Sequence, residues 1–247
     1  MNIYGQVGWR AAAAVNPSQA STLWNNVYAV YNAENNANDE LNTYNGTPMG
    51  GLTYGVGKVG TAFNFNGSTS YVQLGDVMDI GLSSWSYGFW IKANVDHAEA
   101  TFFSKSYSGI GAGRLFAHVK NYTLSITFTP TSTGVITVQT PANSILKNNW
   151  YHIVCVLDRN DKIKAYINGV LQTLTTTAGT NNLTSYVATD YNTNNPFRIG
   201  CYTGSNNTTA VLFFNGQIDA FNVWNKVLDQ TEVTELYNSG NGKQYPN

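Results

Sequence analysis

Strict alternation of apolar and hydroxyl side chains between Tyr122 and Thr129 is the clearest pattern in the sequence. Large apolar residues stand at the even positions from Tyr122 to Phe128, and Thr or Ser stands at the odd positions from Thr123 to Thr129. Successive side chains of a strand point to opposite faces of its sheet. The segment is therefore predicted to be a β-strand with one face in the core and the other in water.

Short apolar runs of strand length recur along the chain, separated by turn residues. They lie at 27–31, on both sides of Asn66-Gly67, at 85–92, from 102, at 150–157, 163–167, 197–200 and 218–224. The Asn-Gly pairs at 66–67, 168–169 and 215–216 are typical of tight turns between strands. About a dozen short strands with frequent turns predict an all-β fold, a two-sheet antiparallel jelly-roll sandwich.

One short helix is predicted near the C-terminus, after the last strand. Asp229 is followed three residues later by Glu232, which is the spacing of a capping box. Apolar residues then recur at helical spacing as far as Tyr237, and Gly240 is suited to the helix end. The chain is thus expected to close with a central strand at 218–224 followed by a helix.

An acidic side chain interrupts the apolar face of this last strand. Counting with a period of two places Asp219 on the same face as Phe221 and Val223. A carboxylate on a buried face is costly unless it is paired, hydrogen-bonded or bound to a metal. Two explanations remain open: Asp219 has such a buried role, or it precedes the buried part of the strand and only caps a turn.

Composition limits the classes of partner. Charged residues make up 11% of the 247 residues and the net charge is −1, so no basic surface for nucleic acid or anionic lipid is expected. Hydrophobic residues make up 43%, but no run approaches the ~20 apolar residues of a membrane span. Asn, Thr, Ser and Gly supply most of the polarity, which suits neutral ligands that form hydrogen bonds. One domain is expected at this length.

Residues 1–26 differ from the rest and are predicted to form an N-terminal arm that precedes a domain at 27–247. Residues 11–14 are all Ala, and Asn16-Pro17 is typical of the first turn of a short helix. A loosely packed leader is the alternative, because chain ends are often poorly ordered. No basic leader precedes an apolar segment, so no export signal is expected. The candidate side chains for assembly with a partner are Tyr4, Trp9 and Trp24.

Catalytic chemistry is not expected. No strand carries alternating carboxylates at the spacing that a glycosidase nucleophile and acid need. Carboxylates that are close in sequence fall in predicted turns, at Asp76 and Asp79, Asp96 and Glu99, and Asp158 and Asp161. None of the three His residues has a Ser or Cys arranged beside it as a nucleophile. Cys155 and Cys201 are interpreted as free thiols, although a single bridge between them stays open.

A long polar loop at 32–45 follows the first predicted strand. Asn36 and Asp39 in this loop carry oxygen atoms of the kind that calcium binds, but their spacing is not that of an EF-hand. A plain polar loop without a ligand is the alternative from this segment alone.

Six segments, taken in order, resemble the laminin G-like type of concanavalin A-like jelly roll. They are AENNANDELN, GKVGTAFNFNGSTSYVQLG, WSYGFWIK, NNWYHIVCVLDRNDKIKAYINGVLQ, RIG and FFNGQIDAFNVWNKVLDQTEV, within residues 27 to 240. The resemblance implies two curved antiparallel sheets and a structural calcium site, common in the family, near the first long loop. The matching positions for its ligands are Asn36, Asp39 and Asp219. Glu34-Asn35 stands where the family often has Asp-Gly, and Asn66 where it often has Asp.

The resemblance and the lack of catalytic motifs predict a non-catalytic glycan-binding or adhesion domain. Sugar binding uses aromatic faces for stacking and amide or hydroxyl groups for hydrogen bonds. The candidate residues, all in polar loop sequence, are Tyr186, Tyr191, Asn192, Asn194 and Tyr202. Ordinary loop residues without a ligand are the alternative at these positions.

Two settings for such a domain are open. The first is the virion surface, in a capsid decoration or tail-associated protein of a phage that contacts other virion proteins through the arm. Assembly in the cytoplasm and release by lysis would need no export signal and would suit free thiols. The second is an extracellular, secreted bacterial lectin module whose signal peptide has been replaced by Met1. A glycoside hydrolase ranks below both, and a homo-oligomer remains open.

Overall fold

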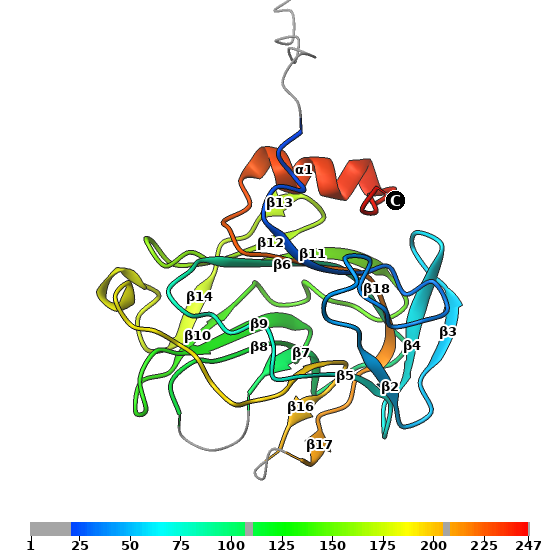
Figure 1. Ribbon diagram of the computed structural model, residues 1–247, viewed down its shortest axis with the longest axis horizontal. Coiled ribbons are helices and arrows are strands. Elements are labelled where there is room, and N and C mark those ends of the chain that lie inside the picture. The colour runs from blue at the N-terminus through cyan, green and yellow to red at the C-terminus, as the bar shows by residue number, and fades with distance from the viewer. Residues whose placement is uncertain (1–20, 107–110, 205–207, 247) are drawn as a thin grey trace, which may run out of the picture.

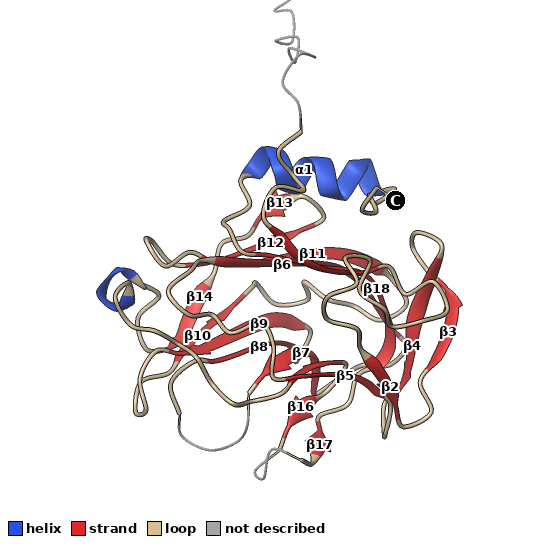
Figure 2. Ribbon diagram, in the orientation of Figure 1, coloured by secondary structure: helices blue, strands red, loops and turns tan. Residues whose placement is uncertain are grey.

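The computed structural model describes residues 21–106, 111–204 and 208–246. They form two antiparallel β-sheets that pack face to face, and helix α1 (Gln230–Tyr237) covers the outer face of the first sheet (Figure 1). Figure 2 shows that strands supply most of the regular structure, as the all-β prediction requires. The predicted jelly-roll sandwich with one short C-terminal helix is confirmed.

The first sheet has its long strands at the centre. In spatial order it contains β13 (Val170–Leu171), β12 (Ile163–Ile167), β11 (Trp150–Leu157), β6 (Trp85–Ala93), β18 (Asn215–Trp224), β4 (Thr61–Asn66) and β3 (Thr53–Val56), and β1 (Val27–Tyr31) pairs with β18. The strand predicted to be central, β18, lies between β6 and β4.

The second sheet lies on the other side of the core. In spatial order it contains β14 (Thr175–Ala178), β10 (Ile136–Gln139), β9 (Thr123–Thr129), β8 (Arg114–Lys120), β7 (Glu99–Lys105), β15 (Phe197–Ile199), β5 (Tyr71–Gly75) and β2 (Thr47–Met49). A small sheet of β16 (Tyr202–Thr203) and β17 (Ala210–Val211) and the 3₁₀ turns η1 (Thr184–Tyr186) and η2 (Asn238–Gly240) complete the regular elements.

Stacked aromatic rings fill much of the space between the two sheets. The ring centroids of Tyr87 and Phe103 are 4.6 Å apart, and those of Phe89 and Phe103 are 5.9 Å apart. Tyr87 and Phe89 come from the first sheet and Phe103 from the second, so these contacts hold the sheets together. Aromatic pairs at such distances contribute about 0.5–1.5 kcal/mol each beyond the area they bury.

The inner face of β9 is apolar and buried, as its alternating sequence predicts, but its outer face is more buried than predicted. The apolar side chains from Leu124 to Phe128 are buried in the core, as predicted. The hydroxyl side chains of Ser125, Thr127 and Thr129 were expected to face water, yet they are 0%, 5% and 1% exposed. Ser125 and Thr127 line a groove that is described below, and the Thr129 hydroxyl accepts a hydrogen bond from Arg114 of the neighbouring strand.

A β-bulge in the closing strand changes the face on which Asp219 lies. Asn215-Gly216 is not the predicted turn, because both residues are already in β18 and pair with β4. Asp219 pairs with Trp90, and the register then shifts around Ala220, whose φ is 45°. Asp219 therefore shares the outer face with Trp90, and the predicted common face with Phe221 is wrong. An extra residue in one strand reverses the period-two count beyond it.

Helix α1 begins and packs as its sequence predicts. Asp229 accepts a hydrogen bond from the backbone amide of Glu232, and the Glu232 carboxylate accepts one from the amide of Asp229, which completes the capping box. Val233 and Leu236 are buried against Trp224 on the outer face of the first sheet. This small apolar cluster fixes the helix to the sheet.

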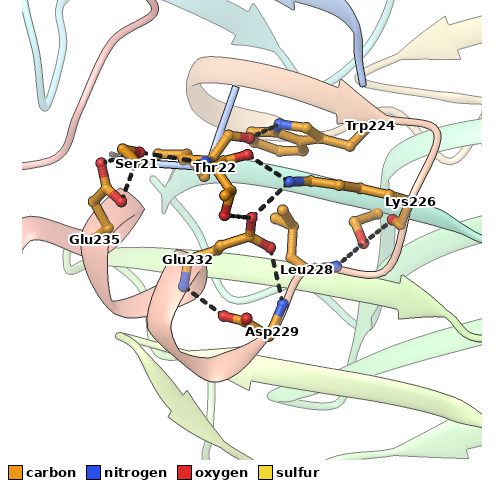
Figure 3. A network of polar contacts seen from close by, with 10 residues as sticks. Ser21, Thr22, Trp224, Lys226, Leu228, Asp229, Glu232 and Glu235 are labelled. Atoms are coloured by element: carbon orange, nitrogen blue, oxygen red, sulfur yellow. Dashed lines mark hydrogen bonds and ion pairs between the residues drawn. The ribbon is translucent and has the colours of Figure 1, made fainter. Parts of the chain in front are cut away.

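The segment before β1 also packs on α1, as Figure 3 shows. Ser21 donates a hydrogen bond to Glu235, and Thr22 donates one of 2.6 Å to Glu232. Lys226 pairs with the same Glu232 carboxylate at 2.6 Å and donates to the carbonyl of Thr22 at 2.7 Å. The packed part of the chain therefore includes residues 21–26, which the sequence assigned to the arm.

Candidate functional site

A groove crosses the outer face of the second sheet. Its volume is about 340 Å³, and strand β8 contributes four of its lining side chains, Arg114, Phe116, His118 and Lys120. Alternate residues of a strand lie on one face, so these four follow β8 for most of its length. The ring of Phe116 is half-buried and stacks on the His118 imidazole with the centroids 5.2 Å apart. The groove thus combines an aromatic face with polar side chains.

Short hydroxyl and amide side chains form the rest of the groove. Ser125 and Thr127 of β9 lie on its floor, and Thr137 and Gln139 of β10 extend it toward β14. Thr127 and Thr137 share one hydrogen bond of 3.0 Å between their hydroxyl groups. This is the face of β9 that the sequence pattern indicated as polar, and it carries groups that suit a neutral ligand.

Three neighbouring polar side chains on this face have unpaired atoms. His118 lies opposite Thr101 on β7 and opposite Ser125 on β9. Thr101 Oγ1, His118 Nδ1 and Ser125 Oγ are buried, and none has a hydrogen-bond partner among the described residues. An unpaired buried polar group costs about 1–3 kcal/mol. The row is therefore costly to the fold unless something else supplies the hydrogen bonds.

Charge in the groove is low and mostly paired. Glu99 of β7 lies 3.6 Å from His118 Nε2 and 3.7 Å from Lys120 Nζ. Burial and the positive charge of Lys120 lower the pKa of His118 to about 4, so the imidazole is neutral at physiological pH. A neutral imidazole beside a paired carboxylate favours uncharged ligand groups at this point.

A second hollow continues the groove at the Val135 end. It has a volume of about 350 Å³, shares Val135 with the first hollow, and is lined by Tyr186. The Arg159 side chain, 2% exposed, donates hydrogen bonds to the carbonyls of Tyr186 and Thr189 and to that of Gly81. Arg159 thus ties the loop that carries Tyr186 to the body of the domain.

The structure places some of the predicted sugar-binding residues at the surface and buries the others. Tyr186 lines the second hollow, and Asn192 and Asn194 are exposed on the same long loop. Tyr191 is only 2% exposed, lies under the Arg159 guanidinium at 4.7 Å and donates a hydrogen bond to the Pro130 carbonyl.

Tyr202 is also buried, at 9% exposed, and its ring contacts Phe116. The expectation that Tyr191 and Tyr202 present exposed stacking faces is therefore wrong. The polar sequence around Tyr191 and Tyr202 did not indicate that other residues pack over their rings. Phe116 and His118 were not predicted as site residues, although the alternating sequence at 114–120 indicates a strand with both side chains on one face.

Asp219 lies in a second polar site, on the outer face of the first sheet. Its Oδ2 accepts hydrogen bonds from the amides of Lys58 at 2.7 Å and Val59 at 2.8 Å, and its Oδ1 is buried without a partner among the described residues. Burial raises the pKa of Asp219 to about 7 against these hydrogen bonds, and the negative charge of Glu34 adds to the rise. Such a carboxylate is one that a bound cation would stabilise.

Glu34 and the glycines of the 57–60 loop border the same site. A Cβ on Gly57 would lie 2.5 Å from Asp219 Oδ2, and one on Gly60 would lie 1.9 Å from Glu34 Oε1, so both positions need glycine. The Glu34 carboxylate accepts hydrogen bonds from Thr61 and Gln244, so Asp219 Oδ1 is the unpaired oxygen that a hard cation such as calcium would bind first. Glu34 was not among the predicted ligands.

Asp39 and Asn36 have other partners. The Asp39 carboxylate is fully buried and accepts hydrogen bonds from four backbone amides of its own loop and β1, those of Val30, Leu41, Thr43 and Tyr44. Asn36 Oδ1 accepts a hydrogen bond from the Asn38 amide. Within the described ranges no three His, Cys, Asp or Glu side chains converge on one point, so Asp39 does not join Glu34 and Asp219 there.

The acidic pairs that are close in sequence are held by lysines. Asp76 and Asp79 both bind Lys105, at 2.7 and 3.2 Å. Asp158 and Asp161 both bind Lys164, at 2.9 and 3.1 Å. Asp96 binds Lys147 at 2.6 Å. Glu99 alone supplies a carboxylate to the groove lining. Both cysteines are free and buried, as interpreted from the sequence.

A family model matches the sequence over residues 66–234, the model described as concanavalin A-like lectin/glucanases superfamily, of the third laminin G type. The chain belongs to this superfamily. The matched residues include β5 to β18 and the start of α1, and with them the whole groove. No curated protein matches the chain. The described residues contain no helix long and apolar enough to cross a membrane.

Solved structures with a similar fold include binding domains of two toxins. The binding domain of Paraclostridial Mosquitocidal Protein 1 has a TM-score of 0.69 at 19% identity, with 88% of this chain and 53% of that chain covered. The botulinum neurotoxin serotype C1 binding domain has a TM-score of 0.62 at 18% identity, with 85% of this chain and 51% of that chain covered. This member of the superfamily thus spans about half the length of either binding domain.

A third similar structure matches over nearly its full length. It is domain 4 of AbnA, an extracellular arabinanase from Geobacillus stearothermophilus, in complex with arabinotriose. Its TM-score is 0.56 at 20% identity, and the alignment covers 85% of this chain and 97% of that one. At these identities the three likenesses show the shared fold.

Proposed function

We propose that the protein is a non-catalytic glycan-binding domain and that the sugar binds in the groove on β8, β9 and β10. The observation that carries the proposal is the groove itself, which places the half-buried ring of Phe116 beside unpaired polar atoms of His118 and Ser125. Sugars need both an apolar face and hydrogen-bond partners. A glycan therefore remains the proposed partner, but its proposed binding site is on the sheet and not on the loop at 186–202.

Several further observations support binding without catalysis. The similar structures are described as binding domains of toxins, and one as an arabinanase domain in complex with arabinotriose. Glycoside hydrolysis ordinarily needs two carboxyl groups at a defined separation. The described groove lining has Glu99 as its carboxylate, and that group faces Lys120 and His118. Binding is thus the chemistry that the groove supports best.

A glycan array tests the function, and one substitution tests the site. Phe116→Ala should lower affinity for the best array ligand about tenfold, because a stacking face of about 0.5–1.5 kcal/mol and the area it buries are removed. Tyr122→Ala is the matched control, since Tyr122 is 37% exposed and lies outside the groove lining. Equal affinity of both variants and the parent would refute the site, and an array without ligands would refute the function.

A structural calcium ion is a second proposal for this chain. Asp219 and Glu34 would hold it with backbone carbonyls, and it would neutralise the Asp219 carboxylate, which burial and the charge of Glu34 otherwise destabilise. The support is the unpaired Asp219 Oδ1 and the glycine loop that borders both carboxylates. Asn36 and Asp39 are replaced in this set by Glu34.

The setting stays a prediction, with the virion surface first and a secreted bacterial lectin second. Tyr4 and Trp9 lie outside the described residues. Trp24 stacks on Trp224 with the centroids 5.7 Å apart, so it contacts the domain itself. Deleting residues 2–20, and not 2–24, leaves this contact intact. Loss of particle or oligomer assembly by that folded deletion variant would support the virion setting, and a deletion without effect on assembly would contradict it.

A further inference from the structure

Two neighbouring residues of the groove lining each carry an unpaired buried polar atom. His118 and Ser125 are cross-strand neighbours on β8 and β9, a pairing that brings Cβ atoms to about 4.5–5.5 Å. The two residues are 3% and 0% exposed, and both line the groove. His118 Nδ1 and Ser125 Oγ have no hydrogen-bond partner among the described residues. Buried polar groups in folded proteins are nearly always paired with protein or water, so these two atoms have hydrogen-bonding capacity left for a ligand.

The chemistry of such a ligand follows from the two atoms. The imidazole Nε2 faces the Glu99 carboxylate at 3.6 Å, which favours the proton on Nε2 and leaves Nδ1 as an acceptor. The Ser125 hydroxyl can donate and accept. A ligand hydroxyl also does both, whereas a carboxylate only accepts and would find no donor at Nδ1. Hydroxyl groups therefore suit the pair, and carboxylates do not.

The surrounding charges and rings agree with an uncharged ligand. The groove lining also holds two cations: Lys120, next along β8, faces Glu99 at 3.7 Å, and Arg114, at the other end of β8, donates a hydrogen bond to the Thr129 hydroxyl at 3.3 Å. The Glu99 carboxylate would repel an acidic sugar placed near His118. The half-buried ring of Phe116, which stacks on His118 at 5.2 Å, supplies apolar surface to the groove lining. One sugar ring could thus lie on Phe116 and direct its hydroxyls to the pair.

We propose that His118 and Ser125 are the recognition centre of the glycan-binding function inferred above, and that the centre selects a neutral sugar ring over an acidic one. Their unpaired atoms would hydrogen-bond hydroxyls of the same ring. Specificity of this kind is strong, because a ligand without these hydroxyls leaves two buried polar atoms unpaired. The inference deepens the proposed function and depends on it.

The test compares two buried serines. Ser125→Ala should lower affinity for neutral trisaccharides, arabinotriose among them, about tenfold, since one hydrogen bond to the ligand is lost. Its thermal midpoint should stay the same or rise, because the hydroxyl is unpaired in the free protein. Ser104 is the matched control: it is equally buried, but its Oγ donates to the Cys201 carbonyl at 3.0 Å. Ser104→Ala should lower the midpoint and leave affinity unchanged.

Imidazole ¹⁵N spectra of the parent protein test independently whether the ligand contacts His118. The His118 Nδ1 signal should shift when a neutral trisaccharide is added, and that of His152 should not. His152 Nδ1 is also buried and unpaired, but its ring packs against Trp90 and Tyr237 on the outer face of the first sheet. Acidic oligogalacturonates of the same length should bind at least tenfold more weakly.

Each contrary result has a separate meaning. If sugars bind but Ser125→Ala keeps full affinity, or acidic sugars bind more tightly, the recognition centre is refuted while the glycan-binding function stands. If Ser125→Ala lowers the midpoint and leaves affinity unchanged, the two atoms hold only a buried water, which also refutes the centre. If no neutral or acidic sugar binds, the proposed function and the recognition centre both fail.

Discussion

Replacing Asp219 by Asn tests the cation site through the dependence of stability on pH. The substitution keeps the size of the side chain and an oxygen that can accept from the Lys58 and Val59 amides, and it removes the charge. Asp219 is fully buried, and burial raises its pKa to about 7 from the ordinary value of 3.8 for an Asp side chain. In the cation-free protein, the charged form is therefore the unfavourable one.

The sign and size of the change in unfolding free energy with pH follow from proton linkage. Between pH 3.8 and 7 the folded protein binds a proton at Asp219 that the unfolded chain has lost, so this contribution to stability is complete at low pH and is lost as pH rises through the folded pKa. At about 1.4 kcal/mol for each pKa unit, the change from pH 5 to pH 8 is about 3 kcal/mol. His118 and His152, whose pKa values are lowered to about 4 and about 3, act in the opposite direction.

The measured quantity is therefore the difference in unfolding free energy between Asp219→Asn and the parent protein, which cancels the histidines. In a chelator, the variant should gain about 3 kcal/mol on the parent between pH 5 and pH 8. With calcium added at pH 8, the parent should recover its stability and the variant should not, because the ion binds only the folded carboxylate. A difference that is independent of pH and calcium would refute the buried, cation-linked carboxylate.

Three further outcomes follow from the structure. Glu232→Ala should lower the unfolding free energy by about 2 kcal/mol in urea titrations, because it removes the Glu232 half of the capping box and the partner of Lys226; a loss below about 0.5 kcal/mol would contradict this role. Arg159→Lys should lower the thermal midpoint, because the loop carrying Tyr186 loses hydrogen bonds that one ammonium cannot replace; an unchanged midpoint would contradict the role of these bonds in holding the loop. Cys155 and Cys201 should resist thiol reagents until the protein unfolds, because burial raises both thiol pKa values; rapid labelling of the native protein would contradict their burial.

Much of the fold was accessible from the sequence because it depends on local periodicity. The alternation at 122–129 and the capping residues Asp229 and Glu232 report short-range rules, and the structure confirms a strand and a helix there. Of the two explanations left open for Asp219, the structure shows the buried one, but on the other face, because the bulge at Ala220 interrupts the period. A bulge depends on pairing with strands that are distant in sequence, so a period-two count does not include it.

The candidate site was less accessible for the same physical reason. Tyr191 and Tyr202 stand in polar sequence, yet Arg159 and Phe116, which contact their rings, come from distant strands and turns. The groove is made of side chains from β7 to β10 and β14 that only the sheet order brings together. Its unpaired atoms at His118 and Ser125 become visible only when burial and hydrogen bonds are known.

The most direct test of glycan binding in the groove is a crystal structure of the protein with its tightest neutral oligosaccharide. The account predicts density for a sugar ring over Phe116, with hydroxyl groups within hydrogen-bond distance of His118 Nδ1 and Ser125 Oγ. Density for the sugar on another face, such as beside Asp219 or on the exposed loop at Asn192 and Asn194, with the groove filled only by water, would contradict it.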